Sequence, residues 1–200
     1  MNKTKIIFFC ILAACFYGIV LDQITVRVCI EYFTVAHAPI FPATSATLLA
    51  LCWGIAASAP IGICFGVILA LVSESGMEPP HQFQRSIRPV FMLLAAMAVA
   101  AFVSGIVGYQ FSQSSIFSLS NDLAEAVPAY KHHRFMAAWF AHGATYLIGL
   151  GGGAFVCLRV WWLRGRPFIM SVFPRSCWAA IRAVSIVSIA AFIIWLRCIN

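Results

Sequence analysis

The residues of this chain that could do chemistry gather in one stretch, between Asp22 and His37. The stretch follows an apolar run and carries two carboxylates, a guanidinium and an imidazole, on Asp22, Arg27, Glu31 and His37. Carboxylate and imidazole groups can bind divalent transition metals, and ionisable groups in a membrane are functional candidates by default. This stretch is therefore the first candidate polar site.

Three more histidines come later in the chain, at or within an apolar block: His132, His133 and His142. His142 is the best instance, because apolar residues surround it on both sides. With these histidines, the weak candidate metal ligands are Asp22, Glu31, His37, His132, His133 and His142. No H-x-x-x-H or H-E-x-x-H spacing supports a metal site. We therefore predict no cofactor and keep a divalent metal as an alternative.

A structural interpretation explains the same residues and is our default. If the chain stays helical beyond its first apolar run, one polar stripe forms at 100° per residue: Gln23, Arg27, Glu31 and Thr34. Arg27 and Glu31 would then form an ordinary i,i+4 salt bridge. His132 and His133 would be solvated, and His142 would be hydrogen-bonded inside a helix bundle.

The composition indicates an integral membrane protein. The chain has 200 residues, of which 62% are hydrophobic and 10% charged, against about 25% charged in soluble domains. The formal net charge is +7, but the basic residues flank apolar blocks rather than forming a basic stripe, which excludes nucleic-acid binding. Most of the eight cysteines lie in apolar blocks, so we predict neither disulfides nor zinc. The lipid bilayer is the first expected partner.

The apolar blocks predict an all-α helical bundle with four core spans, at about 6–21, 46–72, 89–110 and 135–158. These spans form a first unit, residues 1–163. Pro60 predicts a kink in the second span, and Gly62-x-x-x-Gly66 a close helix contact. The first block could instead be a cleaved leader with a lipoprotein-like box at Cys15, but its apolar length favours a retained helix.

A basic loop and a C-terminal helix are expected in residues 164–200. The segment from Trp178 to Leu196 has spanning length, but Arg182 lies one turn inside it. We predict a fifth transmembrane helix, with an interfacial helix as the alternative.

The distribution of basic residues predicts a cytoplasmic N-terminus. Most of the 13 Lys and Arg residues fall on the same side as the N-terminus: Lys3, Lys5, Arg85, Arg88, Arg159, Arg164, Arg166, Arg175 and Arg182. The Asp22–His37 stretch and the 122–134 segment then share the other side, with His142 about two turns into the fourth helix. Polar groups from both regions are therefore expected to meet. In the second region, Asp122 and Glu125 predict a capping box that opens a short helix stopped by Pro128.

Two motifs resemble those of a family of small uncharacterised bacterial multi-pass inner-membrane proteins. The first is Tyr17-Gly-Ile-x-x-Asp-Gln-x-Thr-x-Arg-x-Cys-x-Glu-Tyr-Phe-Thr-x-x-His37, and the second is Ala141-His-x-x-x-Tyr-x-x-Gly-x-x-Gly-Gly153. Family members often have a histidine directly before the aspartate, where this chain has Leu21, which weakens the metal interpretation. The resemblance implies membership, topology and a bacterial inner membrane, and no known activity.

The expected function is that of a non-enzymatic structural or assembly component, with a membrane-protein partner or a homo-oligomer as further partners. The chain has no G-x-S-x-G motif, P-loop or dinucleotide fingerprint. The alternative is a metal-ion or small-solute site at the outer mouth of the bundle, enzymatic or transport-related. A transporter predicts internal repeats and broken spans, which the sequence does not show clearly.

Overall fold

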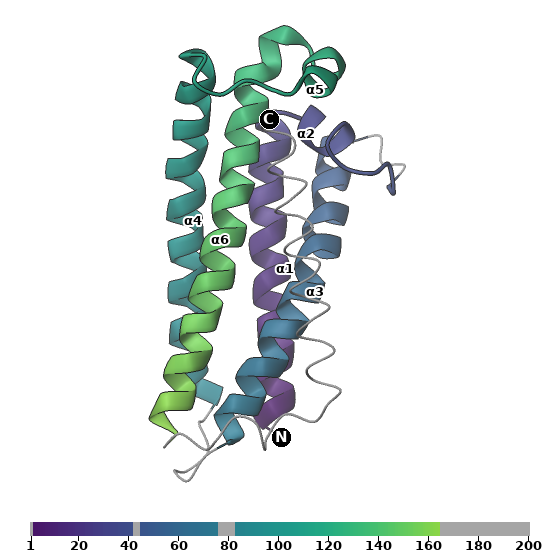
Figure 1. Ribbon diagram of the computed structural model, residues 1–200. Coiled ribbons are helices and arrows are strands. Elements are labelled where there is room, and N and C mark those ends of the chain that lie inside the picture. Colours follow the sequence, from purple (N-terminus) through teal and green to yellow (C-terminus); the bar gives the residue numbers. More distant parts are fainter. Residues whose placement is uncertain (1, 42–44, 76–82, 165–200) are drawn as a thin grey trace.

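The computed structural model describes residues 2–41, 45–75 and 83–164, and within these ranges the protein is all-α (Figure 1). Four long helices form the bundle: α1 (Asn2–Val28), α3 (Ala46–Glu74), α4 (Phe83–Gln113) and α6 (His132–Leu163). Two short helices, α2 (Glu31–Thr34) and α5 (Asn121–Ala126), and a 3₁₀ turn at Ala129–Lys131 lie together at one end, hereafter the α2 end. The predicted all-α fold with four core helices is confirmed.

Each of the four long helices is long and apolar enough to cross a membrane. The candidate spans hold between 26 and 35 residues, or about 40–50 Å at 1.5 Å per residue, against a hydrocarbon core of about 30 Å. The helices therefore extend beyond the predicted spans: α1 continues from Leu21 to Val28, and α4 begins six residues before Pro89. α3 continues through Pro60. The predicted fifth helix lies outside the described residues.

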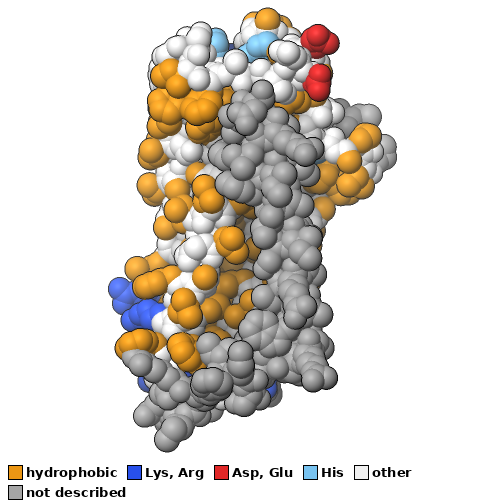
Figure 2. All heavy atoms as spheres, viewed as in Figure 1, with side chains coloured by type: hydrophobic (Ala, Val, Ile, Leu, Met, Phe, Trp, Pro, Cys, Tyr) orange, Lys and Arg blue, Asp and Glu red, His pale blue; other side chains and the backbone are white. Residues whose placement is uncertain are grey.

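Charge and apolar surface are separated along the bundle. In Figure 2, orange apolar side chains cover much of the visible side of the described bundle, Lys and Arg lie near the lower end, and His, Asp and Glu lie near the upper, α2 end. Many large apolar residues on the long helices are exposed, among them Phe16, Phe102 and Phe155. A lipid bilayer is the environment that such a surface fits.

The four long helices form two closely packed pairs, α1 with α3 and α4 with α6. In the first pair, glycines on one face of α3 touch the backbone of α1. A Cβ atom on Gly54 would lie 2.7 Å from the Ile19 Cα, and one on Gly62 would lie 2.8 Å from the Ile11 Cα. Gly66 makes a similar approach, so the predicted Gly62–Gly66 contact is confirmed and one earlier glycine joins it. Small residues permit this close approach between membrane helices.

In the second pair, Gly108 of α4 packs on α6, where an added Cβ would lie 2.7 Å from the carbonyl oxygen of Met136. Gly105 and the buried Ala101 are on or near the same face. Ala95, Ala96 and Ala98 are exposed. The small residues of α4 therefore divide between a packed face and an outward face.

The first helix ends earlier than the polar-stripe prediction required. α1 stops at Val28, and a new short helix, α2, begins at Glu31. The break buries Cys29, Tyr32 and Phe33 in the apolar cluster at the α2 end. No Gly or Pro marks the break, so burial of these side chains overrides the helical tendency of the local sequence.

Two cap predictions have different outcomes. Ser45 caps α3 as expected, because its Oγ accepts a hydrogen bond from the Leu48 amide at 3.1 Å. The capping box at Asp122 is wrong: the N-cap is Ser120, two residues earlier, its side chain forms no cap hydrogen bond, and α5 begins at Asn121. Asp122 instead lies in the first turn, where a negative charge favours the helix dipole. The helix ends before Pro128, as expected.

The glycine contact between α1 and α3 predicts the direction in which a substitution changes thermal stability. Gly54→Ala should lower the thermal stability of the purified protein, because its Cβ would meet backbone atoms that cannot rotate away, at a cost of about 1–3 kcal/mol. Gly151→Ala is the matched control, since its Cβ would meet nothing within 4 Å and the higher helix propensity of alanine should preserve or raise stability. Equal melting temperatures for the two variants in detergent would contradict the packing described.

Candidate functional site

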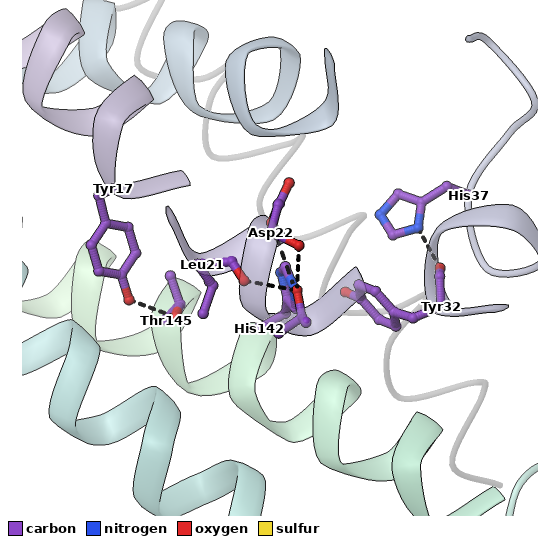
Figure 3. A network of polar contacts seen from close by, with 8 residues as sticks. Tyr17, Leu21, Asp22, Tyr32, His37, His142 and Thr145 are labelled. Carbon is purple, nitrogen blue, oxygen red and sulfur yellow. Dashed lines mark hydrogen bonds and ion pairs between the residues drawn. The ribbon is translucent and has the colours of Figure 1, made fainter. Parts of the chain in front are cut away.

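Asp22 and Thr25 of α1 meet His142 of α6 in the seam between the two helix pairs (Figure 3). All three residues are buried: Asp22 is 5% exposed and His142 is 7% exposed. The His142 Nε2 lies 3.1 Å from the Thr25 Oγ1 and 3.7 Å from the Asp22 Oδ1. The predicted meeting of the Asp22–His37 stretch with His142 is confirmed. We call these three residues the centre.

The hydrogen bonds of Thr25 indicate which histidine nitrogen holds the proton. The Thr25 hydroxyl lies 3.0 Å from the carbonyl oxygen of Leu21, which can only accept. A threonine hydroxyl has one proton to donate. When it donates that proton to Leu21, it must accept one from the Nε2–H of His142. The same N–H then faces the Asp22 carboxyl, at a distance longer than a hydrogen bond.

Aromatic rings enclose the centre at the α2 end. The Tyr32 ring stacks on the His142 ring, with centroids 4.6 Å apart, and Phe33 meets the same ring edge-on. His37 lies against Tyr32, Phe33 and Trp53. The break between α1 and α2 is what brings these rings over His142, since it turns Tyr32 and Phe33 into the bundle.

His37 is held in one orientation by the backbone. Its Nδ1 donates to the carbonyl oxygen of Tyr32 at 2.8 Å. Figure 3 shows its other ring nitrogen and the Tyr32 hydroxyl pointing toward the centre. Burial lowers the pKa of His37, and the bond to Tyr32 opposes part of that effect. The ring is therefore neutral at pH 7. Burial, with the nearby Tyr146 and Asp22, raises the pKa of the Tyr32 phenol well above its ordinary value.

Glu31 pairs with a residue that the sequence analysis did not assign to it. The Lys131 Nζ lies 2.5 Å from the Glu31 Oε1, and the Cys29 thiol donates to the Oε2 at 3.3 Å. Burial alone would raise the pKa of Glu31, but these hydrogen bonds and the lysine charge lower it overall. Burial and the Glu31 carboxylate raise the pKa of the Cys29 thiol to about 11, which makes it a poor nucleophile.

Arg27 is the candidate residue that faces away from the centre. Its guanidinium donates to the Gln23 carbonyl and side-chain oxygens and to the Thr47 Oγ1. Gln23 and Arg27 of the predicted polar stripe are in contact, but the expected Arg27–Glu31 salt bridge is wrong. Because α1 ends between these two residues, the i,i+4 geometry that would join them does not exist.

The other two histidines have local structural partners. His132 Nε2 donates to the Val127 carbonyl oxygen at 2.9 Å, and His133 Nδ1 lies 3.0 Å from the Ser112 Oγ. Both bonds tie the start of α6 to neighbouring segments. Within residues 2–41, 45–75 and 83–164, no group of three or more His, Cys, Asp or Glu side chains is placed to hold a metal ion.

Four residues of this region were missed as site residues: Thr25, Tyr32, Trp139 and Thr145. Thr145 lies deeper in the seam, where its Oγ1 is 3.1 Å from the Tyr17 hydroxyl. The first two lie within the quoted N-terminal motif, and Thr145 lies one helical turn after His142. That spacing could have placed Thr145 on the face of His142. Nothing in the sequence indicates that Trp139 would be buried beside Tyr32.

Two buried polar groups near the centre lack hydrogen bonds in the part of the chain that the structure describes. The Trp139 indole Nε1–H has no partner, although Trp139 is 7% exposed. The Asp22 carboxyl has its 3.7 Å contact with His142 and no hydrogen bond. Such groups usually have partners in native proteins, so each needs an explanation.

No family model, curated protein or solved structure matches this chain. A carboxyl and an imidazole buried together can attract one another, hold a proton or bind a small polar molecule.

The lowered pKa of His37 predicts a pH-dependent stability. Below the ordinary histidine pKa of 6.5, His37 is protonated in the unfolded chain but stays neutral in the folded protein. The free energy of unfolding therefore falls as the pH decreases from about 7 to 5. His37→Gln should flatten this dependence, measured as melting temperature against pH. Loss of ring stacking adds only an offset, so wild-type and variant curves that run parallel would contradict the prediction.

Proposed function

We propose that the protein is a non-enzymatic, multi-pass component of the bacterial inner membrane, in which the centre joins two helix pairs into one unit. The observation that supports this proposal is the polar seam. Each pair is packed internally by glycines, whereas α1 and α6, one from each pair, are linked by hydrogen bonds between Thr25 and His142 and between Tyr17 and Thr145.

A polar link suits this task because apolar contact alone does not specify helix partners in a membrane. Lipid tails are as apolar as leucine, so there is little hydrophobic drive for α1 to prefer α6 over lipid. A hydrogen bond across the seam contributes about 0.6–2 kcal/mol and is satisfied in one relative position only. The two bonds, separated by about two turns of α1, therefore define how the pairs align.

The burial of the centre supports a structural role over catalysis. Asp22 and His142 are covered by the rings of Tyr32 and Phe33. Glu31 and Arg27 are occupied by Lys131 and by Gln23 and Thr47. A membrane-protein partner or a second copy of the chain remains a prediction for the exposed apolar faces.

The charge distribution supports a cytoplasmic N-terminus. Among the described residues, Lys3, Arg85 and Arg164 belong to the end opposite α2, where Lys3 pairs with Glu74 at 2.6 Å. A periplasmic reporter such as alkaline phosphatase should be active when fused after Ala38 and inactive when fused after Ser75. The reverse pattern would contradict this orientation.

A small-solute site is the second candidate function, favoured by the Asp22 carboxyl, whose contact with His142 is longer than a hydrogen bond, and by the Trp139 indole, which has no hydrogen-bond partner among the described residues. A polar molecule could donate a hydrogen bond to the carboxyl or accept one from the indole. A metal ion is less well supported, because His37 Nδ1 is engaged by Tyr32 and the described residues contain no three-ligand group.

Substitution of His142 tests the proposed joint, by which we mean the polar contacts of the centre that hold α1 against α6. His142→Leu should lower thermal stability in detergent by about 1–3 kcal/mol, because it removes the hydrogen bond to Thr25 and the imidazole that faces the buried Asp22 carboxyl. Leu147→Ala is the control on the same helix, since Leu147 is 57% exposed and its removal should change little.

A His142→Leu variant as stable as wild type would contradict the proposal that the centre joins the two helix pairs. Native mass spectrometry of the same samples addresses the second candidate. A small molecule bound to wild type and lost from His142→Leu would support the solute site instead, whereas a stoichiometric protein partner on both would support the assembly role.

A further inference from the structure

We propose that Asp22 and His142 together form a proton-binding site, which exchanges one proton with water at the α2 end and thereby sets the strength of the contact between α1 and α6. This inference rests on the proposed function, because it concerns the same joint between the helix pairs. Its ligand is a proton, and its source is the aqueous phase on one side of the membrane.

The charge of the pair depends on how many protons it holds. When Asp22 and His142 share one proton, they are neutral overall, either as carboxylate and imidazolium or as carboxyl and imidazole. When they hold none, one negative charge is buried between α1 and α6, which is costly unless a cation compensates it. The contact of 3.7 Å between Nε2 and Oδ1 is short enough for the two groups to sense each other's charge.

No fixed cation compensates Asp22 within the described ranges of the chain. Arg27 donates to Gln23 and Thr47, and Lys131 pairs with Glu31. The titratable groups that face the centre are Tyr17 of α1, Tyr32 of α2, His37 after α2, and Tyr146 of α6. The packed side chain from α3 is Trp53, which does not titrate. None of these groups carries a fixed positive charge, so a proton is the available counter-ion.

The surroundings of the centre favour a proton over a larger ligand. The ring of Tyr32 lies 4.6 Å from that of His142, and the ring of His37 lies 4.6 Å from that of Trp53. These are contact distances between aromatic rings. A proton needs no additional space between them.

His37 and Tyr32 give the centre a path toward water. His37 is half-buried at the α2 end, and its second ring nitrogen and the Tyr32 hydroxyl point toward the centre in Figure 3. Both groups can donate and accept protons through hydrogen bonds. Deeper in the seam, the next polar contact is the Tyr17–Thr145 bond. Exchange is therefore expected from the α2 end.

Protonation should change the joint because it changes the attraction across the seam. With one proton bound, the pair is neutral overall, either as an imidazolium and a carboxylate that attract each other or as a neutral imidazole and carboxyl. With none, the Nε2–H of His142 remains bonded to Thr25, and Asp22 holds an uncompensated charge that favours hydration and opening of the seam.

The experiment is a pH titration of the full-length protein in proteoliposomes, with two spectroscopic readouts that detect the proton on either partner. Infrared difference spectra report a protonated carboxyl, assigned by its loss in Asp22→Asn. Nitrogen NMR of the histidine rings reports an imidazolium, assigned by its loss in His142→Gln. We expect one of these signals to titrate between about pH 4 and 9, and to be unchanged in the control Glu31→Gln, whose carboxylate pairs with Lys131.

A titrating signal that disappears in both Asp22→Asn and His142→Gln, or whose midpoint moves by about one pH unit in the variant that retains it, supports the shared site. The absence of any Asp22- or His142-dependent titration across this range would overturn it.

Thermal stability measured on the same samples separates this inference from the proposed function. The asparagine in Asp22→Asn matches the protonated carboxyl in size and neutrality, so the variant should lose the fall in stability that deprotonation of the pair causes as the pH rises, and keep the dependence that His37 contributes at lower pH. If His142→Leu loosens the protein but no proton signal titrates, the joint stands and the proton inference fails. If the signal titrates but neither variant alters stability, the pair binds a proton without setting the contact between α1 and α6, so the proposed function and that part of this inference both fail.

Discussion

The buried contact between His142 and the Asp22–Thr25 turn of α1 is the interaction on which the rest of the arrangement depends. A carboxyl and an imidazole inside an apolar bundle are costly unless each finds a partner. Thr25 supplies one hydrogen bond to His142, while Asp22 remains 3.7 Å away without a hydrogen bond in the described part of the chain. The centre is therefore partly satisfied, which makes it both a link and a group that can respond to its surroundings.

The glycines of α3 and the rings of α2 serve this contact in different ways. Gly54, Gly62 and Gly66 bring α3 against α1 and so give α1 a firm support. Tyr32 and Phe33 cover His142 from the α2 end and separate it from water. Packing is therefore close inside each pair and sparser between the pairs, where polar contacts link α1 to α6.

Much of the site geometry was predictable from charge and topology. The orientation of the spans placed Asp22 and His142 at the same end, and the structure brings them together. The predicted Arg27–Glu31 salt bridge is wrong, because the prediction assumed a continuous helix through Cys29. Burial of Cys29, Tyr32 and Phe33 in the cluster with α6 ends that helix. Sequence periodicity reports local helical tendency and cannot predict the energy of contacts with a distant helix. The same limit applies to Lys131, which lies 100 residues from its partner Glu31.

The sequence by itself determined the membrane class, the four long helices and the end of the bundle at which the polar residues lie. These follow from the length of apolar runs and the positions of lysine and arginine, which act locally along the chain. Only the tertiary structure decided which polar residues meet. It selected His142, Thr25 and Asp22 for the centre, and it directed Arg27 to Thr47 and Glu31 to Lys131. The physical reason is that a buried polar group takes the partner that helix packing brings within reach, and that packing is set by contacts between distant segments.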